Sequence, residues 1–172
     1  MADRTSLRLP GPPTPFDHTH AVEDFRCGIP SLDEWLRRRA LANQYTGATR
    51  TFVALNGSRA VCGYYALANG AVSHGLSPGA VRRNMPNPLP VIILARMAVA
   101  NSLQGHGLGA ALLQDAFRRC LHVAEHTGVR ALLVHAKDEK ARAFYAHHGF
   151  VDSPVQPMML MLNLRLGKSA TL

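Results

Sequence analysis

The chain has 172 residues, of which 47% are hydrophobic and 17% are charged, so it is long enough to bury its own core and fits one compact domain. Its apolar runs are far shorter than the ~18 residues that cross a bilayer, and the N-terminus has no apolar signal core. The net charge is +8, because 19 lysines and arginines face 11 acidic residues, and 16 of the 19 are arginine. This excess points to a phosphate-bearing partner, since guanidinium groups match phosphate oxygens; a surface whose arginines are merely solvated fits the same numbers.

The three cysteines, Cys27, Cys62 and Cys120, lie far apart and form no C-x-x-C pair. An odd number of widely spaced cysteines is typical of reduced, buried thiols in the cytosol. We therefore expect a cytoplasmic protein without disulfides that does not enter a membrane.

The first 16 residues contain four prolines, which favour extended backbone and lack amide donors. They predict a leader over residues 1–16 that lies on the domain or is mobile. The domain itself is expected over residues 17–166, followed by a short tail over 167–172.

Ser31 and Glu34 have the spacing of a capping box at a helix start. Apolar residues at helical intervals follow them. The pattern predicts a first helix from 32 to 43.

The middle of the chain reads as strands. Residues 51–55 and 60–67 are strand-like and enclose the Asn56-Gly57-Ser58 turn, which predicts a β-hairpin. The proline-rich stretch 75–90 is expected to be irregular apart from a short turn near 80–83. The mostly apolar run 91–99 suits a buried central strand.

The C-terminal half alternates helices and strands. We expect a helix from 108 to about 126, a strand over 130–136, a helix over 138–147 and a strand over 158–164. The whole order predicts an α/β fold in which one mixed β-sheet, changing from antiparallel to parallel, is flanked by helices.

A glycine-rich loop, Gln104-Gly105-His106-Gly107-Leu108-Gly109, joins the expected strand 91–99 to the next helix. Backbone amides converge on an anion at such a helix start, and the helix dipole adds positive potential. A dinucleotide fingerprint fits poorly, because the glycines do not follow the strand directly and the next strand ends in His135 rather than in an acid. The Q-x-x-G-x-G reading fits better, with a purely structural role in helix packing as the alternative.

This loop, with Ala141-Arg142-Ala143-Phe144-Tyr145 and Gly149-Phe150 downstream, resembles the two signatures of the GCN5-related N-acetyltransferase (GNAT) family. The resemblance implies the GNAT fold and acetyl-CoA as co-substrate. It implies that the pantetheine pairs with Met97, Ala98 and Val99, and that the pyrophosphate lies on the amides of Gln104, Gly105, His106, Gly107, Leu108 and Gly109. It also implies that Tyr145 protonates the departing CoA thiolate, which a phenol of pKa ~10 can do; a packing aromatic is the alternative.

Amide formation needs a neutral amine. None of the 11 carboxylates falls in 51–67 or 91–99, the strands where a general base would face the acceptor. A lysine amine, with a pKa of ~10.4, would need such a base, whereas an α-amine of pKa ~8 is partly neutral already. The sequence therefore favours an α-amino acceptor, although a histidine or a water chain would also serve as base.

A wider pattern is similar to the TacT-type toxins of bacterial toxin–antitoxin pairs over about residues 10–164. The matching segments are Phe25-Arg26-Cys27-Gly28, Leu32 to Ala40, Thr49-Arg50-Thr51-Phe52, Gly63-Tyr64-Tyr65-Ala66-Leu67, Arg82-Arg83-Asn84-Met85-Pro86 and Leu133 to Asp138. This resemblance implies acetylation of the α-amine on aminoacyl-tRNA, which blocks translation. It further implies a ribbon-helix-helix antitoxin of the DUF1778 type, a homodimer and a bacterial cytoplasm.

Arginines are the expected tRNA contacts. Arg82 and Arg83 lie in the loop before the strand 91–99, and Arg37, Arg38 and Arg50 lie nearer the N-terminus. Consecutive helical residues turn by about 100°, so neighbouring arginines on one helix cannot all face one groove. For each arginine the alternative is a solvated surface position.

Two other functions fit parts of the sequence. One is an ordinary GNAT enzyme that acetylates a protein N-terminus or a small amine. The other is a basic nucleic-acid-binding module with a vestigial cofactor cleft. The segment His122-x-x-Glu125-His126 has zinc-ligand spacing, but it falls at a helix end away from the expected cleft, so we expect no metal.

Overall fold

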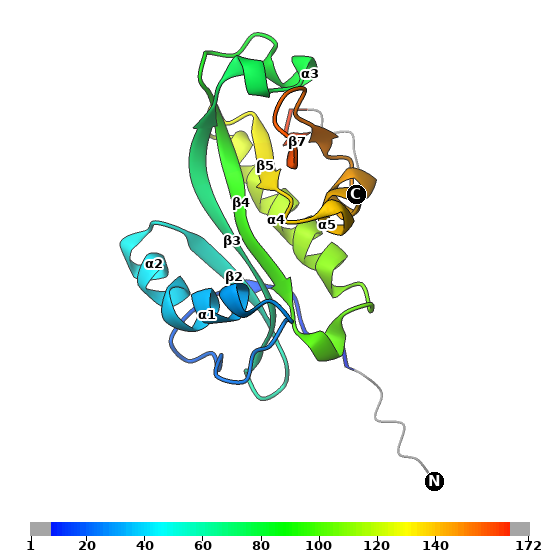
Figure 1. The fold of residues 1–172 in the computed structure, drawn as a ribbon. Coiled ribbons are helices and arrows are strands. Elements are labelled where there is room, and N and C mark those ends of the chain that lie inside the picture. The colour runs from blue at the N-terminus through cyan, green and yellow to red at the C-terminus, as the bar shows by residue number, and fades with distance from the viewer. Residues whose placement is uncertain (1–7, 166–172) are drawn as a thin grey trace. The chain divides into compact units, whose positions relative to one another are not determined.

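The computed structural model describes residues 8–165, which contain a seven-stranded sheet in the order β1-β2-β3-β4-β5-β7-β6 (Figure 1). The strands are β1 Thr14–Pro15, β2 Arg50–Leu55, β3 Val61–Val72, β4 Leu89–Val99, β5 Ala131–His135, β6 Val151–Asp152 and β7 Met159–Asn163. The helices are α1 Pro30–Arg38, α2 Ala40–Thr46, α3 Gly79–Arg82, α4 Leu108–Ala124 and α5 Glu139–His147, with short 3-10 turns at His74–Leu76 and Asn101–Leu103. Residues 1–7 of the predicted leader and the predicted tail 167–172 lie outside the described residues.

The sheet is mixed, as predicted. Strand β5 runs parallel to β4 and antiparallel to β7, and β7 pairs antiparallel with β6. The expected hairpin is present, since β2 and β3 are neighbours in the sheet. The predicted order of helices and strands is thereby confirmed.

Part of the proline-rich leader forms the edge strand β1. Thr14 pairs with Val53 and Pro15 with Phe52 in an antiparallel register. An edge strand tolerates proline, because a proline nitrogen that faces away from the ladder has no hydrogen bond to lose. This part of the leader therefore lies on the domain.

The first helix differs from the prediction in both its start and its length. It begins at Pro30, with Ile29 as the flanking residue and no side-chain cap. Proline has the backbone angle of a first helical residue, so it moves the start ahead of Ser31, which then lies inside the first turn. The carboxylate of Asp33 instead accepts a hydrogen bond from the Cys27 N–H at 2.9 Å. The helix also breaks at Arg39, which separates α1 from α2.

The chain forms two compact units. The first comprises the residues up to Ala66 together with Arg96–Leu113, and the second comprises Leu67–Ala95 and the residues from Gln114 onward.

Tyr64 lies in the core of the first unit. Its side chain is fully buried, and its hydroxyl donates a hydrogen bond to the Leu32 carbonyl at 2.8 Å. Its ring stacks on Trp35 and meets Phe25 edge-on, with centroids 5.9 and 5.6 Å apart. These contacts attach α1 to β3.

The core of the second unit gathers apolar residues from β4, β5 and β7. Val91, Leu133, Met159 and Met161 are all buried in it. The methionine-rich final strand is therefore a core strand, as its composition indicates.

All three cysteines are buried, and none of them forms a disulfide. Burial raises the pKa of the Cys120 thiol to about 12 and also raises the pKa of Cys62. A thiol that stays protonated at neutral pH is a poor nucleophile and metal ligand. The two cysteines therefore serve as small core residues.

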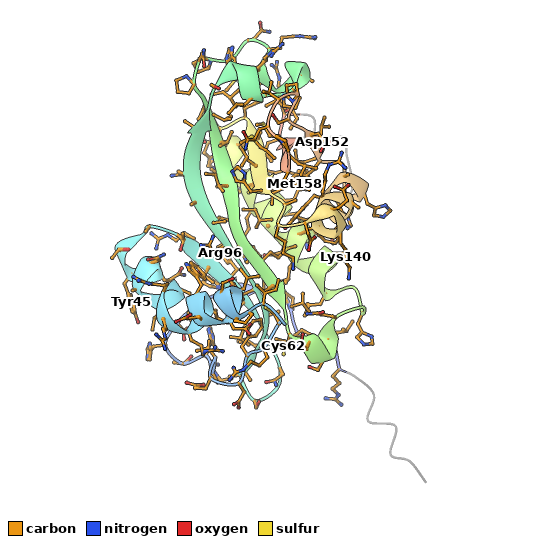
Figure 2. The ribbon with its side chains drawn as sticks, viewed as in Figure 1. Tyr45, Cys62, Arg96, Lys140, Asp152 and Met158 are labelled. Carbon is orange, nitrogen blue, oxygen red and sulfur yellow. The ribbon has the colours of Figure 1, made fainter. Side chains whose placement is uncertain are left out.

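Helix α5 starts and ends as predicted. The Asp138 side chain caps it by accepting a hydrogen bond from the Ala141 N–H at 2.8 Å, and Gly149 follows the helix with a φ of 90°. The short strand β6 was not predicted, because two residues give no periodicity. Arg142 ties it to α5 by donating two hydrogen bonds to Asp152, at 2.8 and 2.7 Å, and one to Glu139 (Figure 2).

We expect the Asp152→Asn variant to melt about 1–3 °C below the wild type at pH 7, since the pair is partly exposed. The hydrogen bonds from Arg142 lower the pKa of Asp152 below its usual value. A lowered carboxyl pKa stabilises the fold above the unfolded pKa of ~3.9, and this stabilisation is lost as the pH falls through the folded pKa. The difference in melting temperature should therefore shrink as the pH falls below about 4.

The matched control is Asp24→Asn, which removes another exposed aspartate. It should leave the melting temperature unchanged at both pH values. An Asp152→Asn deficit that did not shrink between pH 7 and pH 3 would contradict the assigned ion pair.

Candidate functional site

The loop between β4 and α4 is braced by the side chain of Gln104. Its amide nitrogen donates hydrogen bonds to the Cys27 carbonyl at 2.8 Å and to the Val99 carbonyl at 2.9 Å. The preceding backbone is held as well, because the Asn101 N–H donates to the Arg26 carbonyl at 2.8 Å. The Gln104 amide thus holds the loop in place.

Gly105 and Gly107 give this loop its turn. Their φ angles are 81° and 85°, in the left-handed region that side chains disfavour. A Cβ atom at either position would meet nothing within 4 Å, so the backbone there is open to an approaching ligand. Helix α4 begins directly afterwards, with the Ala111 N–H donating to the Gly107 carbonyl at 3.1 Å.

The start of α4 presents an anion site. The first N–H groups of a helix have no intrahelical acceptor, and the helix dipole makes this end positive. Leu108 is buried and anchors the first turn, while Gln104, Gly105, His106 and Gly107 are exposed. The loop can therefore offer several backbone donors to a pyrophosphate.

Gly63 on β3 is a site residue that the sequence analysis did not identify. A Cβ atom there would lie 3.1 Å from Leu112, 3.3 Å from Leu108 and 3.3 Å from the Ala98 carbonyl. The missing side chain lets the first turns of α4 approach the sheet closely. A glycine inside a strand pattern is the signal that could have indicated this contact.

The predicted pantetheine segment, Met97 to Val99, is the end of β4. Strands β4 and β5 pair only at Val91–Ile93 and Ala131–Leu133, although both strands continue beyond this ladder. The last three residues of β4 are thus outside the ladder to β5.

Tyr145 lies on α5 in the second unit and is 7% exposed. Its ring packs against Phe144 and Phe150, with centroids 5.3 and 5.4 Å apart. Burial raises the pKa of the phenol to about 12. The hydroxyl is therefore protonated at neutral pH and can donate a proton.

The structure separates the five predicted tRNA arginines into two groups. Arg37, Arg38 and Arg50 lie in the first unit, and Arg82 and Arg83 lie in the second. Three of them also brace the fold by donating to backbone carbonyls: Arg37 to Phe25 at 2.9 Å, Arg50 to Gln44 at 2.8 Å and Arg82 to His74 at 3.2 Å. Arg38 is exposed and pairs with Glu34 at 3.1 Å.

The segment with zinc-ligand spacing does not assemble into a metal site. His122 and His126 have ring centroids 5.0 Å apart, and His122 Nδ1 lies 4.0 Å from Glu125. Within residues 8–165, no group of three or more histidine, cysteine, aspartate or glutamate side chains is placed to hold a metal. No helix in the same range has the length and apolar character needed to span a bilayer.

A mixed sheet with a glycine turn at the start of the helix after β4, and an A-x-x-F-Y helix ending in G-F, defines an N-acetyltransferase of the GNAT class. The sequence profile of the acetyltransferase (GNAT) domain matches residues 47–152. The chain belongs to this family.

Proteins similar to this chain include toxins. A tRNA-acetylating toxin of Mycobacterium tuberculosis (strain H37Rv) is 53% identical over 144 residues, which cover 84% of this chain and 86% of that protein. The structure of AtaT complexed with acetyl-methionyl-tRNAfMet has a TM-score of 0.82 at 25% identity, covering 88% and 92% of the two chains. An AtaT Y144F mutant, bound to the C-terminus of the antitoxin AtaR and acetyl-CoA, has a TM-score of 0.77 at 24% identity, covering 92% and 98%.

We expect the Gly107→Ala variant to bind acetyl-CoA about tenfold more weakly, because a left-handed backbone costs a non-glycine residue about 1–2 kcal/mol. Relief of that strain would turn the loop amides away from the pyrophosphate. Isothermal titration calorimetry with acetyl-CoA measures the loss.

Gly57→Ala is the matched control, because Gly57 has open space around it and no positive φ. Its affinity should stay within about twofold of the wild type. Unchanged acetyl-CoA binding by Gly107→Ala would show that this turn does not form the cofactor site.

Proposed function

We propose that this protein is the toxin of a type II toxin–antitoxin pair and uses acetyl-CoA to acetylate the α-amino group of aminoacyl-tRNA, which blocks translation. One observation carries the proposal: the chain is 53% identical, over 84% of its length, to a protein named as a tRNA-acetylating toxin. The glycine turn and the A-x-x-F-Y helix agree with it, because the first can offer backbone amides to a pyrophosphate and the second carries a phenol that can protonate a thiolate.

The cofactor site is assigned to two consecutive segments of the first unit. The pantetheine pairs with the end of β4 at Met97, Ala98 and Val99. The pyrophosphate lies on the backbone of Gln104, Gly105, His106, Gly107, Leu108 and Gly109. The open positions of Gly105 and Gly107 and the dipole of α4 support this assignment.

Tyr145 is the general acid of the reaction. The acceptor nitrogen attacks the acetyl carbonyl, the carbon–sulfur bond breaks, and the Tyr145 hydroxyl protonates the leaving thiolate. A proton released by the acceptor amine then restores the phenol. A phenol whose pKa is raised to about 12 remains protonated throughout the physiological range, so it is always ready to donate.

The acceptor is an α-amine. Strands β2, β3 and β4 carry no aspartate or glutamate that could act as a strong base. An α-amine of pKa ~8 is partly neutral at physiological pH and needs less help than a lysine amine. The net charge of +8 agrees with a tRNA carrier for this amine.

The tRNA backbone contacts are assigned to Arg82, Arg83, Arg37, Arg38 and Arg50. Arginines that brace a carbonyl through one nitrogen retain further N–H donors for a phosphate oxygen. All five of these arginines are exposed, which supports the assignment.

The partner is a ribbon-helix-helix antitoxin, and the toxin itself is a homodimer. The solved complex of AtaT with the antitoxin AtaR agrees with an antitoxin partner, while the ribbon-helix-helix type and the homodimer rest on the family resemblance. The acceptor places the protein in the bacterial cytoplasm, where charged tRNA is used.

We expect labelled acetyl to pass from acetyl-CoA to a pool of charged tRNA and not to deacylated tRNA. Label on charged tRNA alone identifies the α-amine as acceptor. Label only on a protein N-terminus or a small amine would replace the proposal by that of an ordinary GNAT enzyme.

We expect Tyr145→Phe to lower kcat by about 10²- to 10⁴-fold, with little change in the KM for acetyl-CoA, because it removes the proton donor alone. Since the phenol pKa is about 12, the wild-type rate should rise as the amine deprotonates and should show no fall before pH 10. Steady-state kinetics from pH 6 to 10 measure both effects.

The matched control is Tyr45→Phe, which removes the hydroxyl of a tyrosine that is 70% exposed on α2 (Figure 2). It should retain wild-type kinetics. Full turnover and growth arrest with Tyr145→Phe would show that Tyr145 is not the general acid. Growth arrest by a wild type that transfers no acetyl group would favour a nucleic-acid-binding module whose cofactor cleft is vestigial.

A further inference from the structure

The second unit contains an open hollow of about 880 Å³ between the end of α4, the start of β5 and the end of β7. Its lining includes Met85, Leu121, Glu125, Arg130, Leu164 and Arg165. The hollow uses none of the residues assigned above to acetyl-CoA, to proton transfer or to tRNA.

Arg130 is held rigidly at the floor of this hollow. Its N–H donates to the Pro90 carbonyl at 3.0 Å, and its carbonyl accepts from the Leu164 N–H at 2.9 Å. The residue is only 9% exposed. Its backbone is therefore fixed on both sides, and its side-chain stem is packed away from water.

The guanidinium of Arg130 forms no hydrogen bond or ion pair within the described range 8–165, although the Glu125 carboxylate lines the same hollow. A second arginine, Arg165, also lines the hollow, and burial together with the charge of Arg165 lowers the pKa of Arg130. Two cations that line one hollow repel each other, and an anion that contacts both relieves this repulsion. The pair therefore has the charge of an anion site.

Further arginines lie beside this pair. Helix α3 contacts β7, and the Asn163 side chain donates to the Ala80 carbonyl at 3.1 Å (Figure 1). Arg82 and Arg83 follow at the end of α3, two residues before Met85 in the lining. Arginines from three separate segments therefore lie at one end of the second unit. A group of arginines distributed in this way suits a chain of phosphates better than one small anion.

We propose that Arg130 and Arg165 bind a backbone phosphate of tRNA in this hollow and extend the surface formed by Arg82 and Arg83. This inference rests on the proposed function, since tRNA is the polyanion that the reaction requires. Phosphate contacts position a nucleic acid without reading its bases, so the site would serve many tRNA species.

Glu125 opposes anion binding, because its carboxylate lines the same hollow. The Val123 carbonyl, near the end of α4, already accepts hydrogen bonds from Thr127 and His126. Removing the charge of Glu125 should therefore strengthen anion binding, whereas removing either arginine should weaken it.

The test measures binding of charged tRNA by wild type, Arg165→Gln, Arg130→Gln and Glu125→Gln at several salt concentrations. We expect each arginine variant to bind about three- to tenfold more weakly and to lose about 0.9 from the slope of log affinity against log salt. Glu125→Gln should bind about two- to threefold more tightly. Arg118→Gln, which removes an exposed arginine of α4 that does not line the hollow, should change neither quantity.

Acetyl-CoA affinity and melting temperature, measured alongside, report whether each variant is folded. Arg165 and Glu125 are exposed, so their substitution should not disturb folding. These two variants therefore keep the test valid if Arg130→Gln fails to fold. A wild type that neither binds nor acetylates charged tRNA would overturn the proposed function and this inference with it.

If the wild type acetylates charged tRNA but Arg165→Gln and Glu125→Gln equal it in tRNA affinity and in the salt dependence of that affinity, the assignment of the hollow to tRNA is wrong. The proposed function is then unaffected. Competition with polyglutamate tests an acidic peptide as occupant. If the arginine variants lose polyglutamate binding but keep tRNA binding, the hollow takes a peptide and the tRNA assignment is wrong.

Discussion

The arrangement of the proposed cofactor site depends on one close approach, that of α4 to the sheet immediately after a glycine turn. Gly63 leaves room for Leu108 and Leu112, and Gly107 turns the chain so that the helix begins beside the end of β4. Gln104 then holds the turn to two backbone carbonyls. A helix that started farther from the sheet would still carry a dipole, but its amides would not lie beside the end of β4.

Arginine has two uses in this protein. Some arginines act inside the fold, as Arg142 does between α5 and β6 and as Arg37 does at the Phe25 carbonyl. Others, such as Arg83 and Arg165, extend from the surface. The high net charge therefore does not measure how many arginines contact a ligand, because some arginines stabilise loops and short elements through their hydrogen bonds.

The assigned acid illustrates how packing prepares a chemical group. Tyr145 is a phenol of ordinary chemistry whose pKa rises because Phe144 and Phe150 help to exclude water from its ring. The same burial that stabilises the end of α5 keeps the proton in place. Stability and proton donation at this position thus have one physical cause.

Patterns with a clear period or a strong local rule were predictable from the sequence: the alternation of helices and strands, the mixed sheet, the Asp138 cap, the glycine loop and the A-x-x-F-Y helix. These features depend on neighbours within a few residues, so the sequence carries them directly. The strands β1 and β6, the close contact at Gly63 and the placement of Arg130 beside Arg165 were not predictable. Each depends on residues far apart in the chain, whose distances and counter-charges only the tertiary structure decides.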